Sequence, residues 1–258
     1  MPARLVLTAL VGLPLVRPGD DLAGAILAGL QASGVALEAG DVIAVAQKVV
    51  SKAEGRLVNL TSITPSPRAR ELAVQSHKDP RLVEAILAES RHVLRVRHGL
   101  IIVRHRLGFV CANAGVDHSN VRGDWGEPDD WVLLLPEDPD ASARRLGERF
   151  EAASGRSVGV LVIDSHGRAW RVGTVGVAIG VSGVPAVLDL RGRSDLFGYR
   201  LQTTDVGFAD ELAGAASALM GQAGEGTPVI HMRGIPYPLR DGSVNDLIRP
   251  ESQDLFRD

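Results

Sequence analysis

The sequence predicts a mixed α/β fold, because short apolar segments of strand type alternate with segments whose apolar residues recur at helical spacing. The chain has 258 residues, of which 45% are hydrophobic, so it is long enough to bury a substantial core. We find no internal repeat and no low-complexity linker. We therefore expect a single domain over residues 1–258, with a two-lobed organisation for which the sequence places no boundary.

Helix boundaries follow from capping residues and glycines. Asp20 or Asp21 can cap the first helix, and Gly34 ends it. A later helix begins at Asp138-Pro139-Asp140 and stops at Gly155.

Strands are indicated by runs of apolar and β-branched residues. Residues 41–50 are expected to form a buried strand that runs into a turn. Residues 93–112 are β-rich, with turns at Gly99 and Gly108, and the Gly- and Val-rich segment 173–188 predicts strands with close backbone approaches. We expect strands over 5–11, 41–50, 158–163 and 228–232, and further strands within 93–112 and 173–188. Besides the first helix, we expect helices over 65–77, 80–89, 138–154 and 206–220. The tail after residue 234 is polar and is expected to lie on the surface.

Composition excludes several classes of protein. A net charge of −3 gives no sign of a nucleic-acid partner, for which a basic patch is typical. The single cysteine, Cys111, cannot form an internal disulfide, which favours a reducing compartment. No apolar run approaches the ~20 residues that span a bilayer, and the N-terminus lacks a secretory pattern. We therefore expect a cytoplasmic protein with no membrane partner.

Two polar clusters, residues 113–120 and 164–171, each follow a predicted strand and each contain an aspartate beside hydroxyl or amide side chains. Asp117 and Asp164 could share a divalent cation, because carboxylate, hydroxyl and amide ligands suit Mg²⁺ or Mn²⁺, whereas zinc favours His and Cys. The structural alternative is an Asx-stabilised turn at the first cluster and a loop or helix cap at the second. The two clusters together favour the site.

The nucleotide-binding patterns of the common folds are absent. There is no GxxxxGK[ST] loop, and no GxGxxG follows a strand. Lys48 and Lys52 have helical spacing, but the preceding Val-rich run favours a strand followed by a turn. Exposed lysines are usually solvated, although either could contact a triphosphate. His118 and His166 are expected to face solvent, and Cys111 to be packed as a small hydrophobe.

Taken together, these residues resemble the coenzyme F420-0:L-glutamate ligases, the F420 gamma-glutamyl ligase family. The match runs in unbroken order from about residue 10 into the C-terminal region. The matching stretches are residues 12–21, 47–56, 113–121, 134–140, 164–171, 178–180, 195–201 and 209–211.

The resemblance implies a GTP-dependent ligase that adds L-glutamate, through its amino group, to the carboxylate of F420-0. GTP would supply an acyl phosphate, and GDP and phosphate would leave. The resemblance also implies Mg²⁺ or Mn²⁺ at up to two sites, K⁺ as a further cation, and an unusual mixed-sheet fold that forms an intertwined homodimer.

By position, the resemblance also assigns roles to individual residues. Ser165 stands where many members carry Thr, and His166 where several carry a residue other than His. Arg168 and Arg171 are candidates for phosphate or carboxylate contacts because of their guanidinium chemistry. The implied metal ligands are Asp117, Asp164, Ser165 and Gln202; the nucleotide contacts are Leu13, Pro14, Leu15, Val16, Gln47, Lys48, Lys52 and Asn120; and the catalytic residues are Asp117, Asp164 and Arg168.

Two alternatives remain open at this stage. A metal-dependent nucleotide phosphohydrolase would use the two aspartates without an amine acceptor. A non-catalytic F420-precursor binding protein would keep the pocket without the chemistry.

Overall fold

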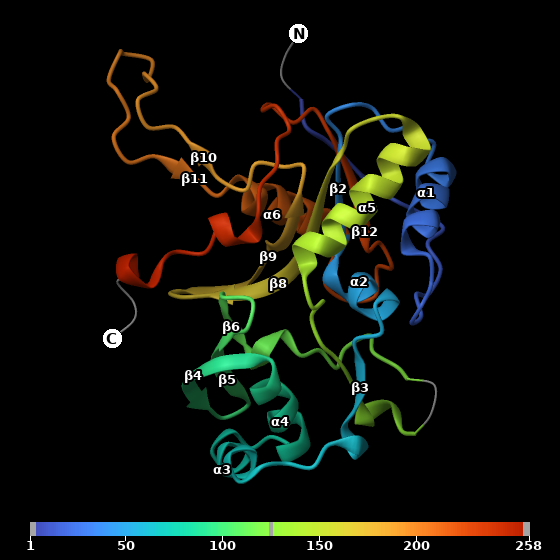
Figure 1. The fold of residues 1–258 in the computed structure, drawn as a ribbon, viewed down its shortest axis with the longest axis vertical. Helices are drawn as coiled ribbons and strands as arrows, with labels where there is room; N and C mark the ends of the chain where they lie inside the picture. Colours follow the sequence, from blue (N-terminus) through green and yellow to red (C-terminus); the bar gives the residue numbers. More distant parts are fainter. Residues whose placement is uncertain (1–3, 124–125, 255–258) are drawn as a thin grey trace.

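The computed structural model describes residues 4–123 and 126–254, and it has the mixed α/β fold that the sequence predicts (Figure 1). A five-stranded sheet in the order β1-β12-β2-β8-β9 forms its centre. β2 and β8 are parallel, and the other neighbouring pairs of this sheet are antiparallel. The bounds are β1 (Val6–Ala9), β2 (Val42–Ala46), β8 (Gly159–Arg168), β9 (Arg171–Ser182) and β12 (Val229–Arg233).

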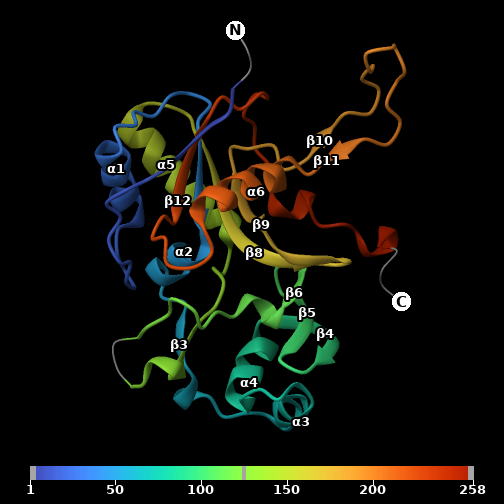
Figure 2. The same cartoon turned by 180° about the vertical axis from the view of Figure 1, so that it is seen from behind.

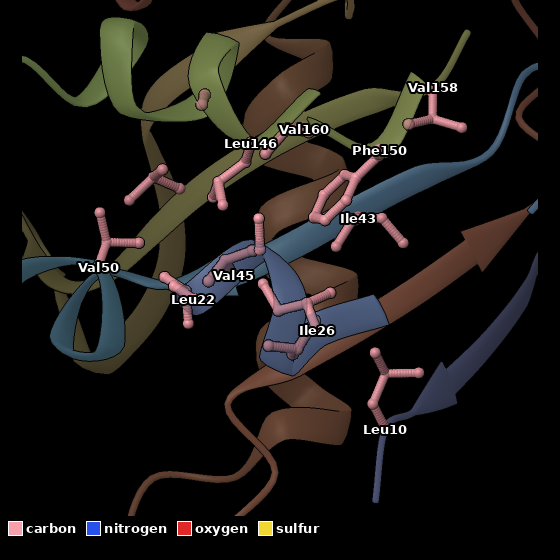
Figure 3. Packing of buried hydrophobic residues seen from close by; sticks show 14 of the residues in the cluster. Leu10, Leu22, Ile26, Ile43, Val45, Val50, Leu146, Phe150, Val158 and Val160 are labelled. Atoms are coloured by element: carbon pink, nitrogen blue, oxygen red, sulfur yellow. The ribbon is translucent and has the colours of Figure 1, made fainter. Parts of the chain in front are cut away.

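One face of the sheet packs against α1 (Leu22–Ala32) and α5 (Pro139–Ser154) (Figure 3). Successive strand residues point to opposite faces, so Ile43 and Val45 both enter this core. Phe150 is fully buried against them. This core therefore fixes α1 and α5 on the same side of β2 and β8.

The other face carries a second core beneath α6 (Phe208–Met220). Val42 and Ala44 point into it from β2. The predicted small-residue side of α6 packs here against β9 of its own chain, and a Cβ added at Gly176 would lie only 2.4 Å from Ser217 Cβ. The small residues that this packing buries completely are Ala209, Ala213 and Ala216.

The predicted helix caps are confirmed. Asp21 accepts a hydrogen bond of 3.1 Å from Gly24 N at the start of α1. Asp138 does the same for α5, and Gly155 ends that helix with a φ of 66°. At Gly180 the backbone of β9 closely approaches the start of α5, as predicted for the Gly-rich segment. A Cβ added at Gly180 would lie 2.4 Å from the backbone oxygen of Pro139.

Two expected boundaries are wrong. The strand expected over 41–50 ends at Ala46, and residues 47–53 form helix α2 (Gln47–Ala53). Helical geometry lets Val50 enter the first core, and this packing outweighs the β-propensity of valine. β8 also continues beyond Ile163 to Arg168, because β9 pairs with it over its whole extension. Asp164 and Ser165 therefore lie in a strand and not in a loop.

A smaller α/β unit is inserted between β3 (Leu57–Asn59) and β7 (Trp131–Leu133), which pair antiparallel. It has its own core, which includes Leu72, Ile86 and Ile101. Its main elements are α3 (Pro67–Ser76), α4 (Pro80–Ala88), β4 (Ser90–Arg97), β5 (Leu100–His105) and β6 (Val110–Ala112). The described part of the whole chain also contains short 3-10 helices at Leu60–Ser62, Asn113–Gly115, Pro128–Asp130, Val244–Asp246 and Glu251–Gln253.

A hairpin arm projects from the body beyond the short pair β10 (Leu188–Asp189) and β11 (Asp205–Val206) (Figure 2). Its residues 190–204 carry two nearly fully exposed apolar side chains, Leu196 at 97% and Phe197 at 95%. Within one chain, the arm leaves these side chains in solvent.

The tail beyond Gly234 is less superficial than expected. Val244 is only 6% exposed, because Asp140 accepts hydrogen bonds from its backbone N and from Ser243 Oγ. Among the described residues, no helix is long and apolar enough to cross a membrane.

A buried ion network attaches the small unit to the main body. The Glu89 carboxylate, whose side chain is 9% exposed, lies 3.0 Å from Arg56 Nη2 and 2.9 Å from Arg106 Nε. Arg56 also donates to Leu135 O, and Arg106 to Glu137 O. One carboxylate therefore orients two arginines that hold the irregular segment 135–137, which follows β7 and leads out of the small unit.

The stability of the protein should depend on the charge of Glu89. Burial alone would raise its pKa, but His105, Arg106 and Arg56 together outweigh burial and lower it to about 2. A lowered folded-state pKa stabilises the fold above the unfolded value, and this contribution is lost as pH falls from 4.5 toward 2. We expect Glu89→Gln to lower the free energy of unfolding by about 3 kcal/mol at pH 7, measured by urea denaturation, and by less below pH 4.5.

The matched control is Glu71→Gln, because Glu71 forms an exposed ion pair with Arg68 in the same unit. We expect this control to change stability by less than about 0.5 kcal/mol. Equal effects of the two substitutions, or an effect of Glu89→Gln that does not change with pH, would contradict the role of the network.

Candidate active site

A cleft of about 1060 Å³ opens at the carboxyl ends of the parallel strands β2 and β8. Ala46 pairs with Ile163, so the residues that follow, Gln47 and Asp164, emerge side by side. Ligand sites in α/β proteins commonly lie at this edge of parallel strands. The cleft is lined by residues 15–18, the first turns of α2, residues 117 and 119–123, the end of β8 and the loop 220–228.

Asp117 is fixed at the cleft by a two-way backbone bridge to Leu133, with N···O distances of 3.0 and 2.9 Å. The turn before it contains positive φ values at Asn113, Ala114 and Gly115. Asn113 Oδ1 accepts a hydrogen bond from Ile101 N, so this side chain holds the turn and does not face the cleft. The structural interpretation applies to Asn113, whereas Asp117 lines the cleft, and the metal role predicted for Asp117 stays a prediction.

The Asp117 carboxylate receives a hydrogen bond of 2.6 Å from Gln47 Nε2 and lies 3.4 Å from Lys48 Nζ. Burial is the main cause that raises the pKa of Asp117 to about 6; Lys48 opposes the shift, and the negative charge of Asp164 adds to it. The site is therefore short of positive charge despite Lys48.

Helix α2 presents both of its lysines to the cleft, because residues four apart lie on one face of a helix. Lys48 Nζ donates to Ser119 Oγ over 2.8 Å, and Lys52 Nζ donates to Asn120 O over 2.6 Å. Burial lowers the pKa of Lys52. Asn120 Nδ2 in turn donates to Ala223 O over 3.0 Å, which connects the two loops of the cleft wall.

Asp164 and Ser165 are adjacent in β8, and both line the cleft. Asp164 Oδ2 lies 3.1 Å from His166 Nε2. Ser165 Oγ donates to Gln222 Oε1 over 2.7 Å, and Gln222 Nε2 donates to Ser217 Oγ. Sequence reasoning missed Gln222, although its glycine-rich surroundings, residues 221–226, are a signal of a ligand-contacting loop.

Two predicted ligand-binding positions of the N-terminal loop reach the cleft, and two do not line it. Leu15 and Val16 line the cleft, and Leu15 is 93% exposed. Leu13 packs against the first core, and Pro14 is exposed outside the cleft lining.

Arg168 and Gln202 lie outside the cleft of their own chain. Arg168 is near the tip of the β8–β9 hairpin, where its Nη1 donates to Gly173 O. Gln202 is on the arm, and its Nε2 donates to Arg200 O. The roles given to these two residues by the family resemblance stay predictions.

The histidines beside the aspartates behave differently. His118 is exposed, as expected. The expectation that His166 faces solvent is wrong, because its side chain is 13% exposed and contacts the ring of Phe109 at 5.2 Å. Cys111 is buried, and burial is the main cause that raises its pKa to about 12, so its thiol is a poor nucleophile.

The donor set of the cleft suits a hard divalent cation. The described part of the chain contains no cluster of three or more His, Cys, Asp or Glu side chains that could hold a metal. Two carboxylates, a hydroxyl and an amide oxygen nevertheless face the same space, from Asp117, Asp164, Ser165 and Gln222. Oxygen donors of this kind fit Mg²⁺ or Mn²⁺. The pKa of Asp117 is raised mainly by burial and further by the charge of Asp164, and a cation beside the carboxylate would offset both effects.

Comparison with known proteins identifies the family of this chain. Residues 11–234 match the family model for F420-0:Gamma-glutamyl ligase. The chain is 48% identical to the coenzyme F420:L-glutamate ligase of Methanothermobacter thermautotrophicus, over 95% of this chain and 96% of the relative. It is 50% identical to the protein of the same name from Methanopyrus kandleri, over 94% and 93% of the two chains. The protein therefore belongs to the F420-0:gamma-glutamyl ligase family.

Proposed function

We propose that this protein is a GTP- and divalent-metal-dependent ligase that joins the amino group of L-glutamate to the carboxylate of F420-0. The observation that carries the proposal is that this chain, a member of the family, has one cleft lined by two carboxylates and two lysines. They are Asp117, Asp164, Lys48 and Lys52. The two named relatives are coenzyme F420:L-glutamate ligases, and this chain matches each of them over nearly the whole length of both proteins. The volume of about 1060 Å³ exceeds what one drug-sized ligand usually fills, so it suits a nucleotide together with an acceptor.

The proposed reaction has two steps. A carboxylate oxygen of F420-0 attacks the γ-phosphorus of GTP, and GDP leaves. The glutamate nitrogen, after losing a proton, then attacks the acyl carbon, and phosphate leaves as the amide forms. Catalysis of such phosphoryl transfer rests mainly on positioning and on neutralising charge.

The chain provides groups for both tasks. Lys48 and Lys52 place two positive charges on one side of the cleft, where they suit the phosphates of the nucleotide. Asp117 and Asp164, with Ser165 and Gln222, would hold the metal. When bound, Mg²⁺ or Mn²⁺ would neutralise phosphate charge. Gln222 is the better-placed amide ligand within one chain, because its Oε1 lies beside Ser165 and Gln202 lies outside the cleft.

The test is a mass-spectrometric assay of the purified protein with F420-0, L-glutamate, GTP and Mg²⁺ or Mn²⁺, with and without K⁺. A gain of one or more glutamyl units that requires GTP and metal supports the ligase and gives the tail length. GTP hydrolysis that ignores F420-0 and glutamate would favour a phosphohydrolase. Tight binding of the precursor without GTP consumption would favour a non-catalytic binding protein.

Removing either carboxylate should abolish ligation without unfolding the protein. We expect Asp117→Asn and Asp164→Asn each to lower the rate at least a hundredfold in the same assay. Each substitution removes a proposed ligand of the metal, and without the metal the phosphate charge is no longer neutralised. Circular dichroism should show a native fold. Asp241→Asn is the control, because Asp241 is exposed outside the cleft. Folded Asp117→Asn or Asp164→Asn variants with near-normal turnover would remove these residues from the metal role.

We also propose that the protein is a homodimer, because two hairpins of one chain expose large apolar side chains that a monomer leaves in water. Leu196 and Phe197 lie on the arm, and Trp170 and Val172, 88% and 100% exposed, lie at the tip of the β8–β9 hairpin. Exposed apolar groups gathered on projecting segments mark protein interaction surfaces.

The dimer should depend on the arm. We expect Phe197→Asp to shift the mass measured by light scattering from dimer to monomer, because a charge would then have to be buried at the interface. Val74→Asp on α3 is the control, since Val74 is also exposed, at 78%, but lies on the small unit. A wild-type protein of monomer mass, or a Phe197→Asp variant that still dimerises, would contradict the proposed interface.

A further inference from the structure

A second, smaller cavity of about 240 Å³ lies at the outer edge of β9, which is the edge strand of the central sheet. We call it the edge cavity. It is enclosed between the β5–β6 turn, β9, the start of α6 and the C-terminal segment 244–249. The residues that matter for its chemistry are Phe109, His166, Ile179, Asp210, Leu247 and Arg249.

The outer wall of the edge cavity is held at both ends. Asp140 accepts hydrogen bonds from Ser243 Oγ over 2.7 Å and from Val244 N. Beyond the cavity, Glu251 forms an ion pair with Arg104 of β5. Between these points the segment packs closely on the β5–β6 turn, where a Cβ added at Gly108 would lie 3.0 Å from the Ile248 side chain. The C-terminal segment is thus a built wall of this cavity.

The edge cavity contains an acid, Asp210, that forms no ion pair within the described part of the chain, although the charge of nearby His166 acts to lower its pKa against the effect of burial. Asp210 Oδ1 accepts a hydrogen bond of 2.9 Å from Ala178 N, and the side chain makes no ion pair with any described residue. Burial raises its pKa, which is the expected cost of a half-buried carboxylate. A bound ammonium group would compensate this charge.

The edge cavity also contains a cation available to a ligand. Arg249 lines it, and its guanidinium makes no hydrogen bond or ion pair with the described part of the chain. Phe109, Ile179 and Leu247 supply apolar walls between the acid and the base. An acid, a base and an apolar surface together match a small molecule that carries an ammonium group and a carboxylate on a short aliphatic chain.

The edge cavity is next to the cleft. His166 lines the edge cavity, and its Nε2 lies 3.1 Å from Oδ2 of Asp164, which lines the cleft. One contacting pair of side chains therefore separates the two spaces. A ligand in the edge cavity would sit beside the site proposed for phosphoryl transfer.

We propose that the edge cavity binds the amino-acid substrate, with Asp210 holding its α-ammonium group and Arg249 a carboxylate. This inference rests on the proposed ligase function and names the place of its second substrate. The cavity is smaller than the ~300–1,000 Å³ of drug-sized sites, so it excludes the nucleotide and F420-0 and accommodates a single amino acid.

The test compares Asp210→Asn and Arg249→Gln with the wild type in the ligase assay at saturating GTP and F420-0. The asparagine keeps an oxygen to accept from Ala178 N, so the variant retains the local fold. We expect Asp210→Asn to raise the KM for L-glutamate at least tenfold and to leave the KM for GTP unchanged. Glu211→Gln and Arg156→Gln are the controls, because both residues are exposed and line neither space.

Glutarate separates the role of Asp210 from general damage, because it has both carboxylates of glutamate and no ammonium group. As a competitor of glutamate, it should inhibit Asp210→Asn at least as strongly as the wild type, because the substitution removes a negative charge, and it should inhibit Arg249→Gln at least tenfold less. Equal losses for glutamate and glutarate in Asp210→Asn would overturn the ammonium contact. An unchanged KM for glutamate in both variants would overturn the whole proposal.

The same variants distinguish this inference from the proposed function. Wild-type turnover establishes the ligase whatever the variants do. If the wild type shows no turnover, equilibrium dialysis with radiolabelled L-glutamate still decides the inference: binding that Asp210→Asn weakens at least tenfold supports it. Absence of binding to the wild type, or equal binding to the variant, overturns it and leaves the edge cavity as a solvent-filled space.

Discussion

The candidate site depends on the parallel pairing of β2 with β8. The pair ends at Ala46 and Ile163, and the chains then diverge, one into helix α2 and the other into the hairpin with β9. Gln47 and Asp164 stand at this point of divergence. Asp117 joins them because its backbone bridge to Leu133 ties the third chain segment to β7. Backbone hydrogen bonds therefore bring three segments distant in sequence to the point where β2 and β8 part, and the side-chain hydrogen bond from Gln47 to Asp117 joins two of them there.

The electrostatics of the cleft support the proposal that a cation and an anion bind there together. Burial disfavours the charged form of Asp117 and the negative charge of Asp164 adds to this effect, while Lys48 offsets only part of the two together, which leaves the pKa of Asp117 at about 6. Lys52 lies in the same cleft and donates to the backbone oxygen of Asn120, and among the residues that the structure describes no carboxylate forms an ion pair with it. A fold selected only for stability would pair such groups or expose them. Their arrangement is consistent with a metal ion and a polyphosphate filling the space between them.

The sequence predicts the α/β class and the caps of α1 and α5, because local patterns determine each of these. It also places Asp117 and Asp164 in one site, although the contacts that bring them to the same cleft are non-local. It fails where non-local pairing decides. Val49 and Val50 have strand propensity but are helical, since the end of β2 is set by its partners. Asp164 lies in a strand because β9 extends along it. Gln222 reaches the cleft only because Ser165 and Ser217 hold its amide, and no pattern around it encodes these contacts. Arg168 and Gln202 lie on hairpins whose surroundings a single chain does not define.

Two aspartates cover the outer edge of β9 in place of a further strand, and their difference is informative. Asp140 accepts from Val181 N on β9 and from Ser243 Oγ and Val244 N of the C-terminal segment, so both of its oxygens are used within the fold. Asp210 accepts from Ala178 N alone, among the bonds seen in the described residues. If edge protection were the only requirement, the simplest arrangement would satisfy both acids equally, because an unpaired half-buried carboxylate costs free energy. Asp210, unlike Asp140, therefore keeps a carboxylate oxygen that is free to accept a hydrogen bond, and this residue lines the edge cavity, next to Asp164. A cationic ligand bound there would offset the free-energy cost of burying the unpaired carboxylate.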